Sequence, residues 1–132
     1  GLKVENYHPD VWLLTERVEG RLIEGEPNDL FVLRLSESGG AGYLWNTDDL
    51  QRSGFGILRD DRLIESAQQA TGTAVRTLTA KRTEPASGAL ALEEVRPWET
   101  PPRPMATFRV RYDLFGKESG MPRAVRKQLM AA

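Results

Sequence analysis

The chain has 132 residues, 39% of them hydrophobic and 28% charged, and its formal net charge is −1. This length fits one domain, and this balance is typical of a globular protein rather than a disordered or membrane-spanning one. The near-neutral charge gives no reason to expect binding to nucleic acid or to a membrane, and the absence of cysteine excludes disulfides and thiol chemistry.

Alternating apolar and polar residues, the pattern of a half-buried strand, recur along the chain. Turn-forming residues such as Glu26-Pro27-Asn28-Asp29 and Pro101-Pro102 separate these runs. The expected strands are, in chain order, Val11–Thr15, Arg21–Glu24, Phe31–Leu35, Tyr43–Asn46, Gly56–Arg59, Ala74–Lys81, Ala89–Val95 and Thr107–Leu114. About seven short strands with turns between them predict an all-β sandwich or barrel.

Two regions depart from the strand pattern. Residues 63–70 contain Glu, Ala and Gln, and both a short helical turn and a loop remain open for them. The tail is rich in Lys and Arg and is expected to be either a short helix packed on the sheet or a disordered end. The expected organisation is an N-terminal strand or linker (1–18), a sandwich domain (19–115) and a basic C-terminal tail (116–132).

The first residue is Gly1 rather than Met, so the chain is expected to be a trimmed product, and whether a leader or a neighbouring domain was removed stays open. The compartment therefore stays open: periplasmic or secreted if a leader was removed, and cytoplasmic otherwise.

Candidate catalytic and metal-binding groups are few. His8 is the only histidine, and the chain has no G-x-S-x-G motif to pair with it. The pairs Asp48-Asp49 and Asp60-Asp61 lack the alternating ligand spacing of a calcium loop and are expected to be solvated carboxylates in turns. No Lys-Ser/Thr follows the glycines near residue 40, so they do not form a phosphate loop. We therefore expect no enzyme activity, no cofactor and no bound metal.

Three loop-like segments carry the clearest functional signal. The first is glycine-rich, and glycine permits positive φ and close backbone approach. The second is a polar stretch before the strand at Ala74, and the third is an Arg-Pro-Trp sequence, in which proline stiffens the loop and Arg and Trp are types enriched in interface hot spots. The candidate contact residues are Ser38, Gly39, Gly40, Ala41, Gly42 and Tyr43, then Ala70, Thr71, Gly72 and Thr73, then Arg96, Pro97 and Trp98.

Two tryptophans lie in or next to these segments. Trp45 lies two residues after Tyr43, so the two side chains share one face of a strand, and Trp45 is predicted to be a buried core residue. For Trp98 two interpretations remain open: a contact residue held on a stiff loop, or a local cap folded against the sandwich edge.

The order and spacing of these motifs resemble the chagasin family, which inhibits papain-like cysteine peptidases. Gly42-Tyr43-Leu44-Trp45 is similar to the end of the family's Asn-Pro-Thr-Thr-Gly-Tyr motif with its following Trp, and Thr71-Gly72-Thr73 is similar to its middle loop. Arg96-Pro97-Trp98 matches its Arg-Pro-Trp motif, and the resemblance covers roughly residues 19–114.

The resemblance implies an immunoglobulin-like β-sandwich whose three loops form a wedge at one end. It implies a reversible, non-covalent inhibitor that inserts these loops into the active-site cleft of a papain-like cysteine peptidase. The expected partner is thus a protein, and a monomer is expected.

The first loop departs from the family motif, because Gly40 and Ala41 stand where the family has threonines and its proline is missing. The loop is therefore expected to be more flexible and to lack two hydroxyl groups. This departure keeps a second function open, a non-inhibitory immunoglobulin-like interaction or regulatory domain of a larger protein. A third, an enzyme or small-ligand binder on the same fold, has no catalytic set to support it.

Overall fold

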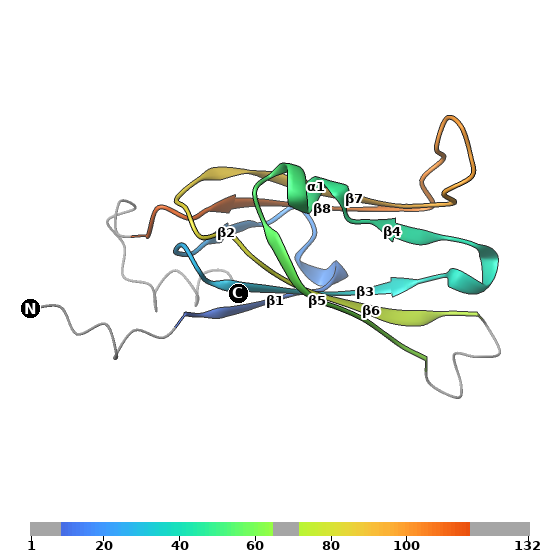
Figure 1. The fold of residues 1–132 in the computed structure, drawn as a ribbon, viewed down its shortest axis with the longest axis horizontal. Helices are drawn as coiled ribbons and strands as arrows, with labels where there is room; N and C mark the ends of the chain where they lie inside the picture. The colour runs from blue at the N-terminus through green and yellow to red at the C-terminus, as the bar shows by residue number, and fades with distance from the viewer. Residues whose placement is uncertain (1–8, 65–71, 117–132) are drawn as a thin grey trace, which may run out of the picture.

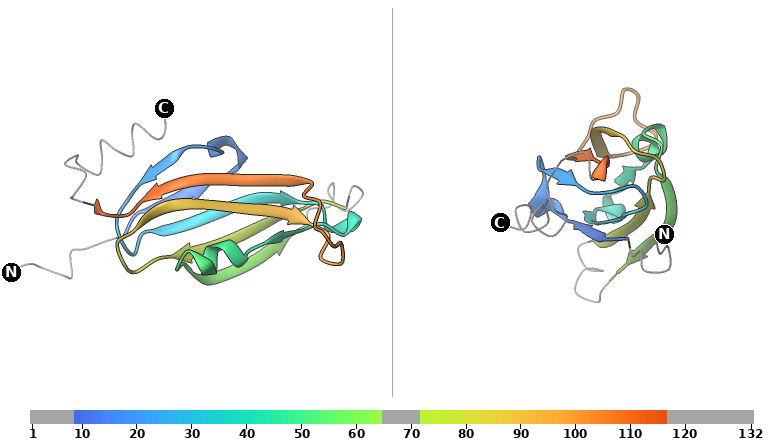
Figure 2. Two further views of the ribbon diagram at one scale, coloured as in Figure 1. Left: turned by 90° about the horizontal axis from the view of Figure 1, so that it is seen from above. Right: turned by 90° about the vertical axis from the view of Figure 1, so that its left-hand side faces the viewer.

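The predicted alternation produces two four-stranded sheets that pack face to face, as the views in Figures 1 and 2 show. The structure is a computed structural model that describes residues 9–64 and 72–116. In these ranges the first sheet has the order β1-β3-β6-β5 and the second the order β2-β8-β7-β4. The strands are β1 (Val11–Leu14), β2 (Leu22–Glu24), β3 (Leu30–Glu37), β4 (Leu44–Asn46), β5 (Gly56–Leu63), β6 (Ala74–Lys81), β7 (Ser87–Val95) and β8 (Ala106–Asp113). This architecture confirms the all-β, immunoglobulin-like sandwich.

Strand pairing makes the two sheets long and narrow. β3 pairs with β6 along its whole length, from Leu30↔Lys81 to Glu37↔Ala74, and β7 pairs with β8 in the same antiparallel way. β1 and β2 are short and pair in parallel with only part of β3 and β8. The ends of β3 and β8 nearer to Glu37 and Ala106 therefore extend beyond β1 and β2.

The core lies between the sheets because alternate residues of each strand face inward. β3 contributes Phe31, Leu33 and Leu35, and all three are buried. Burying one such side chain fully contributes about 1.5–3 kcal/mol. Trp45 is 4% exposed and belongs to the same cluster, which confirms its predicted core position.

The predicted placement of the two acidic pairs in turns is wrong, although Asp48, Asp60 and Asp61 are exposed as expected. Asp48 and Asp49 begin a short helix, α1 (Asp48–Arg52), in which Leu50 is buried and the Asp49 carboxylate accepts a hydrogen bond from the Ala91 N–H at 2.7 Å. Asp60 and Asp61 lie within β5, which continues beyond the predicted end at Arg59 to Leu63. Charged side chains are tolerated in this strand because it lies at the edge of its sheet.

Two 3₁₀ turns complete the described structure: η2 (Glu16–Val18) between β1 and β2, and η3 (Gly39–Ala41) between β3 and β4. Residues 65–70 and the tail from 117 onward, for which the sequence left a helix or a loop open, lie outside the described residues. Among the described residues no helix is long and apolar enough to cross a bilayer.

Candidate protein-binding site

The three predicted loops meet at one end of the sandwich, on the right in Figure 1. They converge because β3–β4, β5–β6 and β7–β8 all reverse direction there. The Gly40 N–H donates to the Gly72 carbonyl at 2.8 Å, which joins the first loop to the second. Arg96 Nε donates to the Ala41 carbonyl at 3.0 Å, which joins the third loop to the first. We call this region, residues 38–43, 72–73 and 96–99, the loop end; the predicted Ala70 and Thr71 lie outside the described residues.

The first loop is a hydrogen-bonded turn. The Ala41 and Tyr43 N–H groups both donate to the Ser38 carbonyl at 3.1 Å, and the Gly42 N–H donates to the Gly39 carbonyl at 2.9 Å. These bonds hold the backbone in the absence of the family's proline. Gly39, Gly40 and Ala41 are exposed at the tip.

Two of the loop contacts require glycine. A Cβ on Gly40 would lie 2.6 Å from the Gly72 Cα, so the two backbones touch only because both residues lack a side chain. Gly42 has φ +86°, and a Cβ there would lie 2.3 Å from Cη2 of Trp98. The loop end is therefore packed backbone to backbone and backbone to ring.

The third loop presents its tryptophan to solvent. Trp98 is 69% exposed although one edge of its ring lies against Gly42, so most of the ring is free to meet a partner, and its role as a contact residue stays a prediction. Arg96 places its guanidinium 4.5 Å from the centre of the Tyr43 ring and pairs with Glu99 at 3.8 Å. Both contacts fix the start of the loop while Pro97 and Trp98 stay exposed.

A buried ion network lies directly beneath the loops. Glu37 and Arg76 are 1% and 5% exposed, and Arg76 Nη1 donates to Glu37 Oε2 at 2.6 Å. Arg76 also binds Asp60 through two nitrogens, at 2.6 and 2.7 Å, and Arg62 Nε donates to Glu37 Oε1 at 2.6 Å. The Trp45 N–H also donates to Glu37 Oε2, at 2.9 Å.

These contacts decide the charge states in the network. Burial alone raises the pKa of Glu37, but the hydrogen bonds from Trp45, Arg62 and Arg76 outweigh it and bring the pKa below its ordinary value. The hydrogen bond from Arg76 likewise lowers the pKa of Asp60. Burial lowers the pKa of Arg76, but hydrogen bonds to its two carboxylates give a net rise, so all three groups are ionised near neutral pH.

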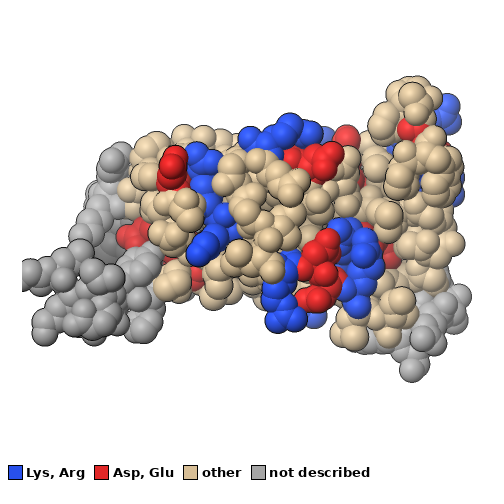
Figure 3. Space-filling model, viewed as in Figure 1, with Lys and Arg blue, Asp and Glu red and all other residues tan. Residues whose placement is uncertain are grey.

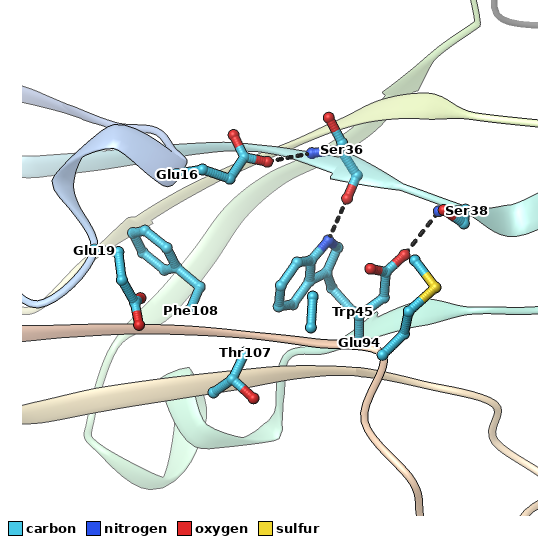
Figure 4. Close-up of a pocket in the computed structure, with 10 residues that line it drawn as sticks. Glu16, Glu19, Ser36, Ser38, Trp45, Glu94, Thr107 and Phe108 are labelled. Atoms are coloured by element: carbon cyan, nitrogen blue, oxygen red, sulfur yellow. Dashed lines mark hydrogen bonds between the residues drawn. The ribbon is translucent and has the colours of Figure 1, made fainter.

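Glu94 is a second buried carboxyl under the loops, and no described lysine or arginine pairs with it. Its Oε2 accepts the Ser38 N–H at 2.7 Å, at the start of the first loop. Figure 4 shows it beside Trp45 in a pocket of about 340 Å³ between β3 and β8. Burial raises the pKa of Glu94, and the nearby charges of Glu37 and Glu16 add to this rise.

Sequence reasoning missed these supporting charges, although a signal was present. Glu37 continues the inward-facing series of Phe31, Leu33 and Leu35, and Arg76 lies on the inward face of β6 with Leu78. A charged residue at an inward position requires a buried partner. The alternation of apolar and polar residues in these two strands therefore predicts a buried ion pair near the loop end.

The surface at the loop end suits contact with a protein. On the face shown in Figure 3, charged side chains gather over β5, whereas the loop end carries few. A second pocket of about 290 Å³ opens there and is lined in part by Leu44, Ile64 and Thr73. Among the described residues no group of three or more His, Cys, Asp or Glu is arranged to hold a metal ion. The arrangement offers aromatic, apolar and backbone contacts.

Comparisons with known proteins agree with the fold described above. A family profile described as "Chagasin family peptidase inhibitor I42" matches residues 26–112. The crystal structure of the cysteine protease inhibitor EhICP2 from Entamoeba histolytica is similar, with a TM-score of 0.69 and 22% identity, covering 83% of this chain and 99% of that one. The solution structure of amebosin has a TM-score of 0.59 and 19% identity, covering 81% of this chain and 99% of that one. A search of curated protein sequences finds no match.

Proposed function

Because the chain belongs to the chagasin family of peptidase inhibitors, we propose that it inhibits papain-like cysteine peptidases reversibly and without a covalent bond, by inserting three loops into the active-site cleft. The observation that carries this proposal is the direct contact between the loops, through the Gly40–Gly72 and Arg96–Ala41 hydrogen bonds. It makes a single protruding edge from three distant stretches of sequence.

Each loop has a part in this proposal. The first loop lies over the peptidase's catalytic cysteine, where Gly39, Gly40 and Ala41 allow close backbone approach. A substrate must lie extended to be cleaved, whereas this segment is a 3₁₀ turn followed by Gly42 at positive φ, so it offers no extended peptide. Arg96, Pro97 and Trp98 contact one wall of the cleft.

The second loop, Ala70, Thr71, Gly72 and Thr73, contacts the other wall. The hydrogen bonds and ring contacts between the loops reduce the conformational entropy that binding would otherwise cost. A rigid sandwich that presents loops in this way is a common basis for recognition.

The test of this proposal is the substitution Trp98→Ala. Removing an exposed aromatic anchor should weaken inhibition by about 2 kcal/mol or more, which is roughly a thirtyfold rise in the inhibition constant. The measurement is a titration of papain and of a cathepsin with wild type and variant. Since Trp98 is mostly exposed, the melting temperature should stay unchanged.

Leu13→Ala is the matched control, because Leu13 is also an exposed apolar residue but lies on β1, away from the loops. It should inhibit like wild type. Equal inhibition by wild type and Trp98→Ala would refute the role given to Trp98.

A non-inhibitory interaction domain is the second candidate, favoured by the absence of threonine hydroxyls at Gly40 and Ala41. It would keep the sandwich and use the loop end for a different protein. Failure of the wild-type domain to inhibit any papain-like peptidase at micromolar concentration would favour it over inhibition.

A further inference from the structure

The stems of two loops meet at a single buried carboxylate. The first loop lies between Glu37, the last residue of β3, and β4, whose Trp45 N–H donates to Glu37 Oε2. The second connection runs from the end of β5 to the start of β6, and Arg62 and Arg76 flank it. Both arginines donate to Glu37, each at 2.6 Å. One side chain therefore contacts both stems of both loops.

Arg76 extends this connection on both sides. Its Nη1 also approaches the Trp45 carbonyl at 3.3 Å, so it holds the β4 stem directly as well as through Glu37. Its other nitrogens hold Asp60 of β5, which orients the guanidinium. A planar guanidinium with several donors can make these contacts at once, whereas a lysine ammonium could not hold the same geometry.

The energetics of buried ion pairs suggest what this network contributes. Replacing a buried pair by apolar residues of similar volume is often neutral for stability, whereas removing one partner is costly. Stability alone therefore does not require Glu37 and Arg76, but their directional hydrogen bonds fix distances that an apolar contact would leave free.

We propose that Glu37 and Arg76 are positioning residues for peptidase binding. They set the separation of the first and second loops and so determine how the loop end fits the active-site cleft of the peptidase. This inference rests on the proposed function and adds residues that do not themselves touch the peptidase. It adds a support from below to the hydrogen bonds that shape the first loop from within.

The experiment compares wild type with the double variant Glu37→Gln/Arg76→Met. The double change removes both buried charges, while Asp60 and Arg62 are 37% and 43% exposed at their side chains and can be solvated. We expect a folded domain whose inhibition constant for papain rises about tenfold, since loops that must be ordered on binding lose affinity. Hydrogen exchange at the Gly40 and Trp45 amides should become faster.

Arg62→Met is a gentler second variant that leaves the Glu37–Arg76 pair in place. It should weaken inhibition about threefold, because the end of β5 is released from Glu37 while the other stems stay held. Its partly exposed position means that folding should be preserved even if the double variant unfolds.

Asp29→Asn is the control for lost stability. Asp29 is buried at the opposite end of β3, where it accepts hydrogen bonds from Trp12 Nε1 and the Asp10 N–H. This variant should lower the melting temperature without changing inhibition. If Arg62→Met inhibits like wild type, or if inhibition falls only in proportion to stability in all variants, the positioning role is wrong.

The exchange measurement separates this inference from the proposed function. Should wild type inhibit no papain-like peptidase, the proposed function fails, but faster exchange at the Gly40 amide in Arg62→Met would still support positioning of the loops. Unchanged exchange there would overturn it.

Discussion

Glycine at the loop end serves contact as well as backbone shape. Gly40 and Gly72 approach so closely that a Cβ on either would come within 3.0 Å of the other's Cα. Gly39 is the neighbour of Gly40 in the same exposed turn, yet a Cβ on it would meet nothing within 4 Å. Two adjacent glycines of one motif therefore differ in what they tolerate.

This difference predicts that one added methyl group has different consequences at the two positions. Gly40→Ala should push the second loop away, lower stability by about 1–3 kcal/mol and weaken inhibition of papain at least tenfold, because an overpacked site must shift its backbone. Chemical denaturation and a peptidase titration measure the two effects. Gly39→Ala is the matched control and should behave like wild type in both; a similar loss in the two variants would contradict the contact.

Restoring the family's threonine in the first loop meets the same obstacle. The substitution Gly40→Thr would place a Cβ against the backbone of Gly72, so the first motif could be exchanged only together with a change in the second loop. The residue at position 40 of the first loop and Gly72 of the second loop therefore have to change together.

At the residue scale, the sequence predicts residues of a local motif but not the partners of buried charges. Arg96, Pro97 and Trp98 were recognisable because a short motif carries their chemistry locally. Glu37 and Arg76 are separated by 39 positions and come together only through the register of β3 with β6. A single strand pattern shows that a charge faces inward, but it does not name the partner.

At the scale of elements, alternation predicted the strands well and their ends poorly. β5 continues past its predicted end because Asp60 is paired with Arg76 on the adjacent strand. The sequence Asp60-Asp61, which was predicted to be a turn, is therefore part of a strand. α1 was missed because five residues are too few for a helical period. Both errors arise from tertiary contacts that act on short segments.

The turn η2 has a second role at the open edges of the sheets. The Glu16 carboxylate accepts the Ser36 N–H at 2.8 Å, and the Glu19 carboxylate accepts the Arg109 N–H. These amides belong to the parts of β3 and β8 that extend beyond β1 and β2. Acidic side chains thus occupy strand edges that could otherwise pair with another chain.

Removing both carboxylates should expose these edges. Glu16→Ala/Glu19→Ala is expected to cost about 1 kcal/mol of stability for each lost hydrogen bond and to increase self-association. Denaturation and sedimentation velocity over a range of concentrations measure the two effects. Arg17→Ala changes the same turn without touching either edge and serves as control; a double variant that associates no more than this control would argue against edge protection.

Across the whole molecule, most of the buried charged groups among the described residues gather beneath the loops, and Asp29 is the one at the opposite end. Trp12, Phe31 and Leu33 pack far from the loops, whereas Glu37 and Glu94 are buried beneath them. The loop end is therefore held by directional bonds as well as by packing, whereas apolar packing predominates in the rest of the core. This division makes the stability of the domain depend on pH through a few buried carboxyls.

Two sets of carboxyls should give the stability an optimum in weakly acidic solution. The pKa values of Glu37 and Asp60 are lowered in the fold, so their contribution is present above the ordinary values of 4.5 and 3.8 and is lost as the pH falls through the lowered ones. The pKa of Glu94 is raised above its ordinary value of 4.5, so its contribution is full below that value and is lost as the pH rises through the raised one. The expected decline on the alkaline side is at most about 1.4 kcal/mol per pH unit, because one proton is involved.

Glu94→Gln separates the two effects, because glutamine can still accept the Ser38 N–H but carries no charge to bury. The free energy of unfolding, measured by urea denaturation between about pH 3 and 8, should fall on the acidic side in wild type and variant alike. Toward neutral pH the wild type should lose stability while Glu94→Gln stays level, so that the variant becomes the more stable of the two. Parallel curves for both proteins over the neutral range would mean that Glu94 ionises in the fold as it does in the unfolded chain. In that case the protection of the Ser38 amide from hydrogen exchange, corrected for the intrinsic pH dependence of exchange, should also stay constant over this range, because the Glu94 carboxyl accepts that amide.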